Sequence, residues 1–173
     1  MLLVSNSALS QTIAEESQST YSRSYFGNWA DIDQDCQNTR HEVLLRDART
    51  YVLSENGCRI VRGLWIDFYT GEWLTSPEEI DIDHLVPLKE IWDSGADIWS
   101  ADDLHDIAND MNNLVVTSRS MNRSKGAREP HEWSRYSEVV NQCRFLNRWF
   151  TFKMDYGLNF DAIELDFLYN SGC

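Results

Sequence analysis

The alternation of hydrophobic and polar residues predicts short strands in the first half of the chain. Hydrophobic side chains alternate with polar ones over residues 59–67 and again from Ile80 to His84, as in strands with one buried face. Residues 69–71 have the composition of a turn, so residues 72–75 should return antiparallel to the first strand. Pro87 should end the second strand, because proline cannot donate a hydrogen bond to a sheet.

In the second half, the spacing of hydrophobic residues changes to three or four. This spacing predicts a helix over residues 138–156, from Val139, Cys143, Leu146, Phe150 and Met154. Shorter helices are expected at 40–49, 88–94, 101–110 and 162–169, most of them beside a capping residue or a glycine stop. A short strand at 114–117 precedes another helix. Helices and short strands together indicate an α+β fold.

The length of the chain limits the number of domains it can form. The 173 residues, 42% of them hydrophobic, are enough for one core, so we expect a single domain over residues 23–173. Residues 1–22 are interpreted as a signal remnant or a disordered leader, because their apolar stretch is short and residues 11–22 are polar. No apolar run approaches the ~20 residues of a membrane span. We therefore expect no membrane partner. We also expect a monomer.

The charge changes this picture, because the net charge of −13 should repel nucleic acid at long range. The charge is uneven along the chain. Residues 63–118 contain thirteen acids and one base, whereas residues 119–153 contain eight bases and three acids. A basic face is therefore expected after residue 118, although such a run is also typical of an ordinary solvated surface.

The candidate chemistry lies between residues 81 and 126. His84 ends one strand and is a candidate general base, because imidazole titrates near neutral pH, at ~6.5 when unperturbed. Asp83 and Asn122 offer the oxygen ligands that a hard cation such as Mg²⁺ prefers. Asn113 begins the next strand, and its carbonyl oxygen is expected to hold the imidazole in one tautomer. Asp83 and His84 can converge only if the strand twists or ends there, because neighbours on a strand point to opposite faces.

Basic residues follow on and after the next helix. We expect Arg119, Arg123, Lys125 and Arg128 to bind substrate phosphates, with Arg123 and Lys125 also contributing to catalysis. Taken singly, each of these residues is more often an ordinary polar surface residue. Taken together, their order and spacing match a known pattern.

That pattern resembles the HNH, or ββα-metal, endonucleases, in the branch written DxDHxxPL…NL…SxxNxSKG. The matching residues are Asp81, Asp83, His84, Pro87, Leu88, Asn113, Leu114, Ser118, Asn122, Ser124, Lys125 and Gly126. The flanks, from about Tyr25 to Cys173, resemble small secreted bacterial nucleases of this family. The resemblance implies a ββα-metal finger embedded in a small mixed domain with a β-hairpin and flanking helices.

The resemblance also implies a function. His84 would be the general base, Asn113 would orient it, and Asp83 with Asn122 would bind Mg²⁺ or another divalent cation such as Mn²⁺. The substrate would be DNA, or RNA as well, cleaved with little sequence selectivity. The protein would be secreted or periplasmic and would carry disulfides. A scavenging role and a toxin role both stay open.

The four cysteines are even in number and form no CxxC pair, which favours disulfides over a zinc site. Three pairings are possible. Proximity in sequence favours Cys36–Cys58 and Cys143–Cys173, and the second would hold down the C-terminus. The alternative is four reduced, buried thiols.

An acidic stretch supports a second hypothesis. Asp31, Asp33, Asp35 and Glu42 stand at positions 1, 3, 5 and 12 of an EF-hand-like loop, but Cys36 replaces the usual glycine. A capping box of Thr39 and Glu42 explains the same stretch more simply. If the loop binds Ca²⁺, the alternative function is a non-catalytic, calcium-stabilised extracellular binding module.

Overall fold

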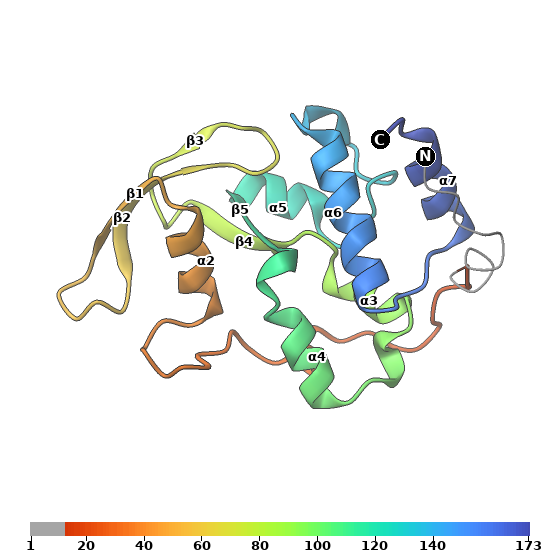
Figure 1. Ribbon diagram of the computed structural model, residues 1–173, viewed down its shortest axis with the longest axis horizontal. Helices are drawn as coiled ribbons and strands as arrows, with labels where there is room; N and C mark the ends of the chain where they lie inside the picture. The colour runs from red at the N-terminus through yellow and green to blue at the C-terminus, as the bar shows by residue number, and fades with distance from the viewer. Residues whose placement is uncertain (1–12) are drawn as a thin grey trace.

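The computed structural model describes residues 13–173, so the apolar start of the predicted leader lies outside the described residues. The fold is mixed α+β, with a three-stranded sheet at one end and most of the helices around and beyond a two-stranded sheet (Figure 1). The strands are β1 (Thr50–Leu53), β2 (Ile60–Ile66), β3 (Trp73–Leu74), β4 (Ile80–His84) and β5 (Leu114–Ser118).

Helices connect and cover these strands. The α-helices are α2 (Thr39–Asp47), α3 (Leu88–Asp93), α4 (Ala101–Ala108), α5 (Arg119–Lys125), α6 (Gln142–Asp155) and α7 (Ala162–Asn170). The short 3₁₀ helices are η1 (Arg23–Phe26), η2 (Ala96–Ile98), η3 (Met111–Asn113) and η4 (Tyr136–Glu138).

The two-stranded sheet positions the central motif. Strands β4 and β5 pair antiparallel, with Asp83 opposite Val115 and His84 opposite Leu114. Alternate side chains of β4 therefore point to opposite faces. Ile80 and Ile82 pack with α2 and Trp65 in a smaller core, and α5 contacts β4 and β5 directly after the second strand. A larger core lies among α3, α4 and α6.

The sheet formed by β1, β2 and β3 contains one strand that the sequence did not predict. β1 pairs antiparallel with β2, but its residues are exposed or only partly buried. No hydrophobic alternation therefore marks β1 in the sequence. Trp65 of β2 is fully buried, and its Nε1 donates to the carbonyl of Leu44 at 2.8 Å, which fixes α2 against this sheet.

Two helices begin differently from the prediction. Asn38 caps α2, with its side chain accepting from the His41 amide, while the hydroxyl of the buried Thr39 donates to the Ala30 carbonyl instead. The predicted Thr39–Glu42 capping box is therefore wrong. Helix α6 begins at Gln142 rather than at 138, because the Asn141 side chain caps it by accepting from the Arg144 amide.

Residues 13–19 lie against the body of the protein, in contrast to the disordered leader that we expected. The Ala14 amide donates to Phe160 at 3.1 Å and the Ser17 amide donates to Asp93 at 2.8 Å. The indole of Trp92 donates to the Ser19 hydroxyl. Polar composition alone did not reveal these contacts, because backbone groups make two of the three.

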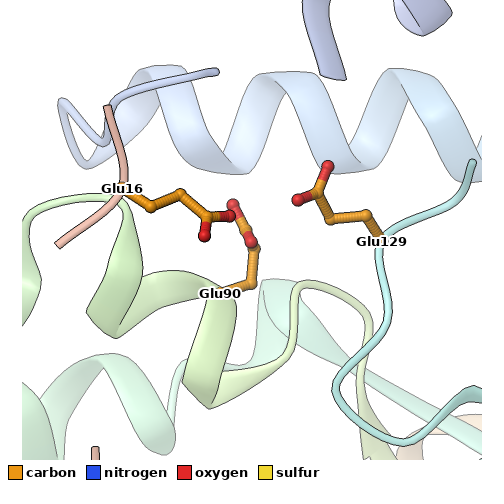
Figure 2. A group of neighbouring side chains, drawn as sticks. All are labelled: Glu16, Glu90 and Glu129. Carbon is orange, nitrogen blue, oxygen red and sulfur yellow. The ribbon is translucent and has the colours of Figure 1, made fainter. Parts of the chain in front are cut away.

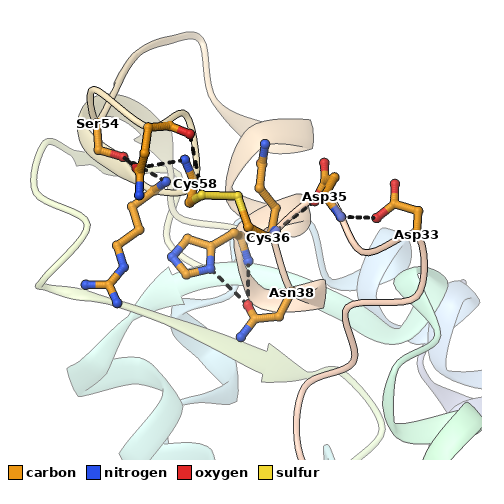
Figure 3. Close-up of a disulfide and its surroundings, with 10 residues drawn as sticks. Asp33, Asp35, Cys36, Asn38, Ser54 and Cys58 are labelled. Atoms are coloured by element: carbon orange, nitrogen blue, oxygen red, sulfur yellow. Dashed lines mark hydrogen bonds between the residues drawn. A yellow bond between two sulfur atoms is a disulfide. The ribbon is translucent and has the colours of Figure 1, made fainter.

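Both predicted disulfides are present. Cys36–Cys58 joins the loop before α2 to the loop before β2 (Figure 3). Cys143–Cys173 joins α6 to the last residue of the chain. The alternative of four free thiols is excluded, since all four cysteines are paired.

Candidate functional site

His84 lies at the end of β4 in a partly exposed position. Its ring stacks on Trp29, with the ring centroids 5.4 Å apart and the planes 5° from parallel. Its Nε2 lies 2.8 Å from the carbonyl oxygen of Ala108. A carbonyl only accepts hydrogen bonds, so Nε2 carries the proton and Nδ1 keeps a free lone pair.

The surroundings of His84 keep the ring neutral. Burial lowers the pKa of His84 to about 3, and the positive charges of Arg23 and Lys125 act in the same direction. The pKa of His84 therefore lies below the value of ~6.5 for an unperturbed imidazole. The ring is therefore unprotonated across the neutral range.

Asp83 points to the opposite face of β4, toward α5. Tyr69 donates its hydroxyl to Oδ2 at 2.7 Å, and the Lys125 ammonium lies 2.9 Å from the same oxygen and 3.2 Å from Oδ1. Burial raises the pKa of Asp83, although Lys125 and Tyr69 counteract this rise. The strand pairs regularly with β5 through His84, so the side chains of Asp83 and His84 leave opposite faces of β4.

Lys125 is fully buried, which differs from its expected role as a phosphate ligand. Besides its ion pair with Asp83, its ammonium donates to the carbonyl of His84 at 2.8 Å. Burial lowers the pKa of Lys125, and Asp83 opposes this shift. In this arrangement Lys125 fastens the end of α5 to the end of β4 and does not face solvent.

Asn122 meets Asp81 rather than Asp83. Its Nδ2 donates to Oδ2 of Asp81 at 3.0 Å, and Nε of Arg119 lies 3.7 Å from the other carboxylate oxygen. Asp81 keeps 30% of its side chain exposed. In the sequence, Asp81 is a motif residue with no predicted ligand role. Asp81 stands two residues before Asp83, so both side chains leave the same face of the strand. This spacing predicts that Asp81 also lies near α5.

Asn113 is fully buried and contacts the turn that follows His84. Its Oδ1 accepts from the Val86 amide at 2.8 Å, and its Nδ2 donates to the Val86 carbonyl at 2.9 Å. Its own carbonyl accepts from the Leu85 amide at 2.7 Å. These contacts hold the backbone beside His84, whereas the sequence suggested a hydrogen bond to the imidazole itself.

The remaining basic residues of the motif are exposed. Arg119, Arg123 and Arg128 all lie at the surface on or just after α5. A separate cleft of about 1350 Å³ is lined in part by Arg46, Arg144 and Arg148. The guanidinium groups of Arg144 and Arg148 lie 4.9 and 5.1 Å from the centre of the Phe68 ring. The sequence did not lead us to expect Arg144 and Arg148 as a pair. Their spacing of four residues on α6 nevertheless places both on one helix face.

Oxygen donors suited to a hard divalent cation occur at the face of β4 next to α5. The Asp81 carboxylate and the Asn122 amide are partly exposed and adjacent, and Asp83 lies on the same strand face. Carboxylate and amide oxygens fit Mg²⁺ or Mn²⁺. Asp83 itself is engaged by Lys125 and Tyr69, so its carboxylate would have to exchange one of these partners to become a ligand.

The carboxylates of the acidic loop before α2 lie close together. Asp31, Asp33 and Asp35 are exposed, and one carboxylate oxygen of each lies within 4.8 Å of the others. Glu42 does not belong to this group, but burial raises its pKa and the charges of the three aspartates add to the rise. Cys36 adopts a positive φ of 74°, at the position where an EF-hand loop has glycine. Calcium binding here stays a prediction.

Comparison with known proteins finds a matching family and a similar protein. The family described as "GmrSD restriction endonucleases, C-terminal domain" matches residues 28–165. The chain is also similar to an "Uncharacterized secreted protein" from Arthroderma benhamiae (strain ATCC MYA-4681 / CBS 112371), with 34% identity over 149 residues. This match covers 85% of the chain and 72% of the relative. No solved structure matches the chain.

These comparisons agree with part of the sequence analysis. The matched family is a nuclease family. The secreted relative and the two disulfide bonds confirm the predicted export, because disulfides persist in oxidising compartments. Among residues 13–173, no helix is both long enough and apolar enough to span a bilayer. The bacterial branch and the HNH motif assignment stay predictions.

Proposed function

The chain belongs to the family of GmrSD restriction endonuclease C-terminal domains, and from this premise we propose that it is a secreted, metal-dependent HNH endonuclease. Its substrate is DNA, cleaved with little sequence selectivity, and RNA is a second substrate to be tested. The unit that carries the activity is the ββα-metal finger formed by β4, β5 and α5.

The observation that carries this proposal is the state of His84. A general base must be unprotonated and must have a lone pair directed away from its own anchoring contact. Because Nε2 is committed to the Ala108 carbonyl, Nδ1 is the atom that accepts the proton of the attacking water. The stacked Trp29 ring holds the imidazole in place for this transfer.

Asn122 and the carboxylates of β4 would hold the divalent cation. Sequence reasoning favours Asp83 as the carboxylate ligand, and the contact between Asn122 and Asp81 adds Asp81 as a second candidate. When bound, the cation supplies Lewis-acid stabilisation of the phosphate and the leaving oxygen. Asn113 and Lys125 act indirectly, because both fix the backbone that presents His84.

Substrate phosphates would contact the exposed arginines. Arg119, Arg123 and Arg128 are exposed on or just after α5, and guanidinium groups bind phosphate through paired hydrogen bonds. These local positive charges would oppose the overall charge of −13. Contacts to phosphate are independent of base sequence, which accounts for the proposed low selectivity.

A plasmid-nicking assay tests the proposal. The purified chain should nick supercoiled DNA with Mg²⁺ or Mn²⁺ and should be inactive in EDTA. His84→Ala should lower the rate by about 10²–10⁴-fold, the usual contribution of a general base. The Mg²⁺ midpoint should not move, since His84 is not a ligand, whereas Asn122→Ala should raise it.

His41→Ala is the matched control, because His41 is another partly buried histidine, on α2 and outside the finger. Near-full metal-dependent nicking by a folded His84→Ala protein would contradict the assignment of the base. Equal shifts of the Mg²⁺ midpoint in His84→Ala and Asn122→Ala would also contradict it, because both residues would then be ligands.

A further inference from the structure

A second group of carboxylates lies away from the nuclease finger. Glu16 of the N-terminal segment, Glu90 of α3 and Glu129, which follows α5, point toward one another (Figure 2). One carboxylate oxygen of each lies within 4.8 Å of the others. Glu90 and Glu129 are buried, with 5% of each exposed. Three segments that are distant in the sequence therefore bring negative charge to one place.

The neighbouring cation does not balance this charge. Lys153 is fully buried and donates to Oε1 of Glu90 at 2.5 Å and to Oε2 of Glu164 at 2.6 Å. The Ser94 hydroxyl also donates to Oε1 of Glu90. Every hydrogen bond recorded for the Glu90 carboxylate thus falls on Oε1. The ion pairs of Lys153 are with Glu90 and Glu164, and it forms none with Glu16 or Glu129.

Glu129 is the exceptional member of the group. Its Oε2 is buried and has no hydrogen-bond partner among the described residues. The nearest cationic candidate, Nδ1 of His131, lies 3.3 Å away but also makes no hydrogen bond. Burial raises the pKa of Glu129 to about 9, and the charges of Glu90 and Glu164 reinforce the rise. A buried, unpaired carboxylate is costly, so this oxygen requires either a proton or a cation.

We propose that Glu16, Glu90 and Glu129 bind a hard divalent cation, Ca²⁺, at a structural site separate from the nuclease centre. Ca²⁺ takes about 6–8 oxygen ligands in flexible geometry, whereas Mg²⁺ demands near-ideal octahedral coordination. Three carboxylates presented by separate segments therefore suit Ca²⁺ better than Mg²⁺.

The site would act as a clamp. It joins the N-terminal segment to α3 and to the chain just beyond α5, four residues after Lys125. Calcium sites of extracellular modules bind with dissociation constants of about 10⁻⁴–10⁻³ M, which suits a secreted protein. Ca²⁺ binding at this site is independent of the proposed nuclease activity. It is measured as a change in the stability of the fold.

Thermal unfolding of the full chain tests the site. After EDTA treatment and dialysis, 10 mM CaCl₂ should raise Tm by about 3–10 °C, given dissociation constants in the extracellular range. Glu129→Gln should abolish this rise. Glu16→Gln should weaken Ca²⁺ binding at least about tenfold, and because Glu16 is only partly buried in a terminal segment, this variant should fold in any case.

Two controls separate this site from the others. Asp33→Asn disrupts the exposed acidic loop and Asn122→Ala disrupts the proposed nuclease metal site, so both variants should keep the full Ca²⁺-dependent rise. Terbium luminescence sensitised by tryptophan gives a second readout, because Trp149 contacts Glu164 beside the group. It should be lost in Glu16→Gln and Glu129→Gln.

Three outcomes would overturn the proposal. One is the absence of a Tm shift at 10 mM CaCl₂. Another is a shift that Glu16→Gln and Glu129→Gln both leave unchanged. The third is a shift that disappears in Asp33→Asn or Asn122→Ala instead, since the cation would then belong to one of those sites. In the first case Glu129 is simply a buried, protonated carboxyl group.

Discussion

The catalytic proposal depends on a single nitrogen, Nδ1 of His84. The hydrogen bond to Ala108 fixes the tautomer, and the parallel contact with Trp29 fixes the plane of the ring. The same contacts shield the imidazole from water, so protonation is disfavoured. The packing of the His84 ring thus both orients the imidazole and keeps it neutral.

The pH dependence of His84 follows directly. A base with a lowered pKa is neutral above that pKa, so His84 should stay unprotonated far below pH 6.5. A histidine NMR titration should show the His84 imidazole unprotonated at pH 5, and His84→Ala should remove its resonance. Trp29→Leu should move its pKa upward by exposing the ring. A His84 midpoint near 6.5 in the unaltered chain would contradict the structure.

At the scale of elements, one buried ion pair joins β4 to α5. Lys125 enters from the last turn of α5 and neutralises Asp83, while Tyr69 satisfies the same carboxylate from the turn after β2. Asn113 performs a similar task at the start of β5 by closing the turn after β4. The two strands and the helix are thereby held in the arrangement that presents His84.

Removing one partner of this ion pair should destabilise the fold. Lys125→Met leaves the buried Asp83 carboxylate unpaired, and breaking such a pair typically costs about 3–5 kcal/mol. Urea unfolding should show this loss, and adding Asp83→Asn should recover part of it. Arg123→Met, on the exposed face of the same helix, should change stability by no more than about 0.5 kcal/mol. Equal effects of the two single variants would show that Lys125 is not structural.

The sequence predicted most of the elements but not all of the site contacts. Strand β4 was predicted with its observed bounds, because hydrophobic alternation and Pro87 mark it. Strand β1 was missed because its exposed residues carry no such pattern. Neither the partner of Asn122 nor the burial of Lys125 could be read from spacing, since both depend on how α5 packs on the sheet. Motif order identifies residue types, whereas packing decides their contacts.

At the scale of the whole molecule, the excess of acidic residues extends into the interior. Glu90, Glu129 and Glu164 are all buried around Lys153. Burial, reinforced by their mutual repulsion, raises the pKa of Glu164 to about 7 and that of Glu129 to about 9. Without a bound cation, the folded protein therefore holds protons that the unfolded chain releases.

This difference makes stability depend on pH, with a sign opposite to that of an ordinary salt-bridged carboxylate. Unfolded glutamates ionise near 4.5, while Glu129 stays protonated in the folded state up to about 9. Because the folded state binds more protons between these values, the free energy of unfolding falls as pH rises. His84 contributes little above about pH 7.5, because an unfolded imidazole with a pKa of ~6.5 is then mostly neutral and the folded one is neutral throughout.

Thermal melts in EDTA at pH 7, 8 and 9 test this sign. One proton of difference is worth at most about 1.4 kcal/mol per pH unit, so Tm should fall by up to about 3–5 °C for each unit. Glu129→Gln should remove most of this slope, because an amide does not titrate. Glu55→Gln, at an exposed loop position, should leave the slope intact. A Tm that stays constant or rises from pH 7 to pH 9 would show that Glu129 is ionised in the folded protein.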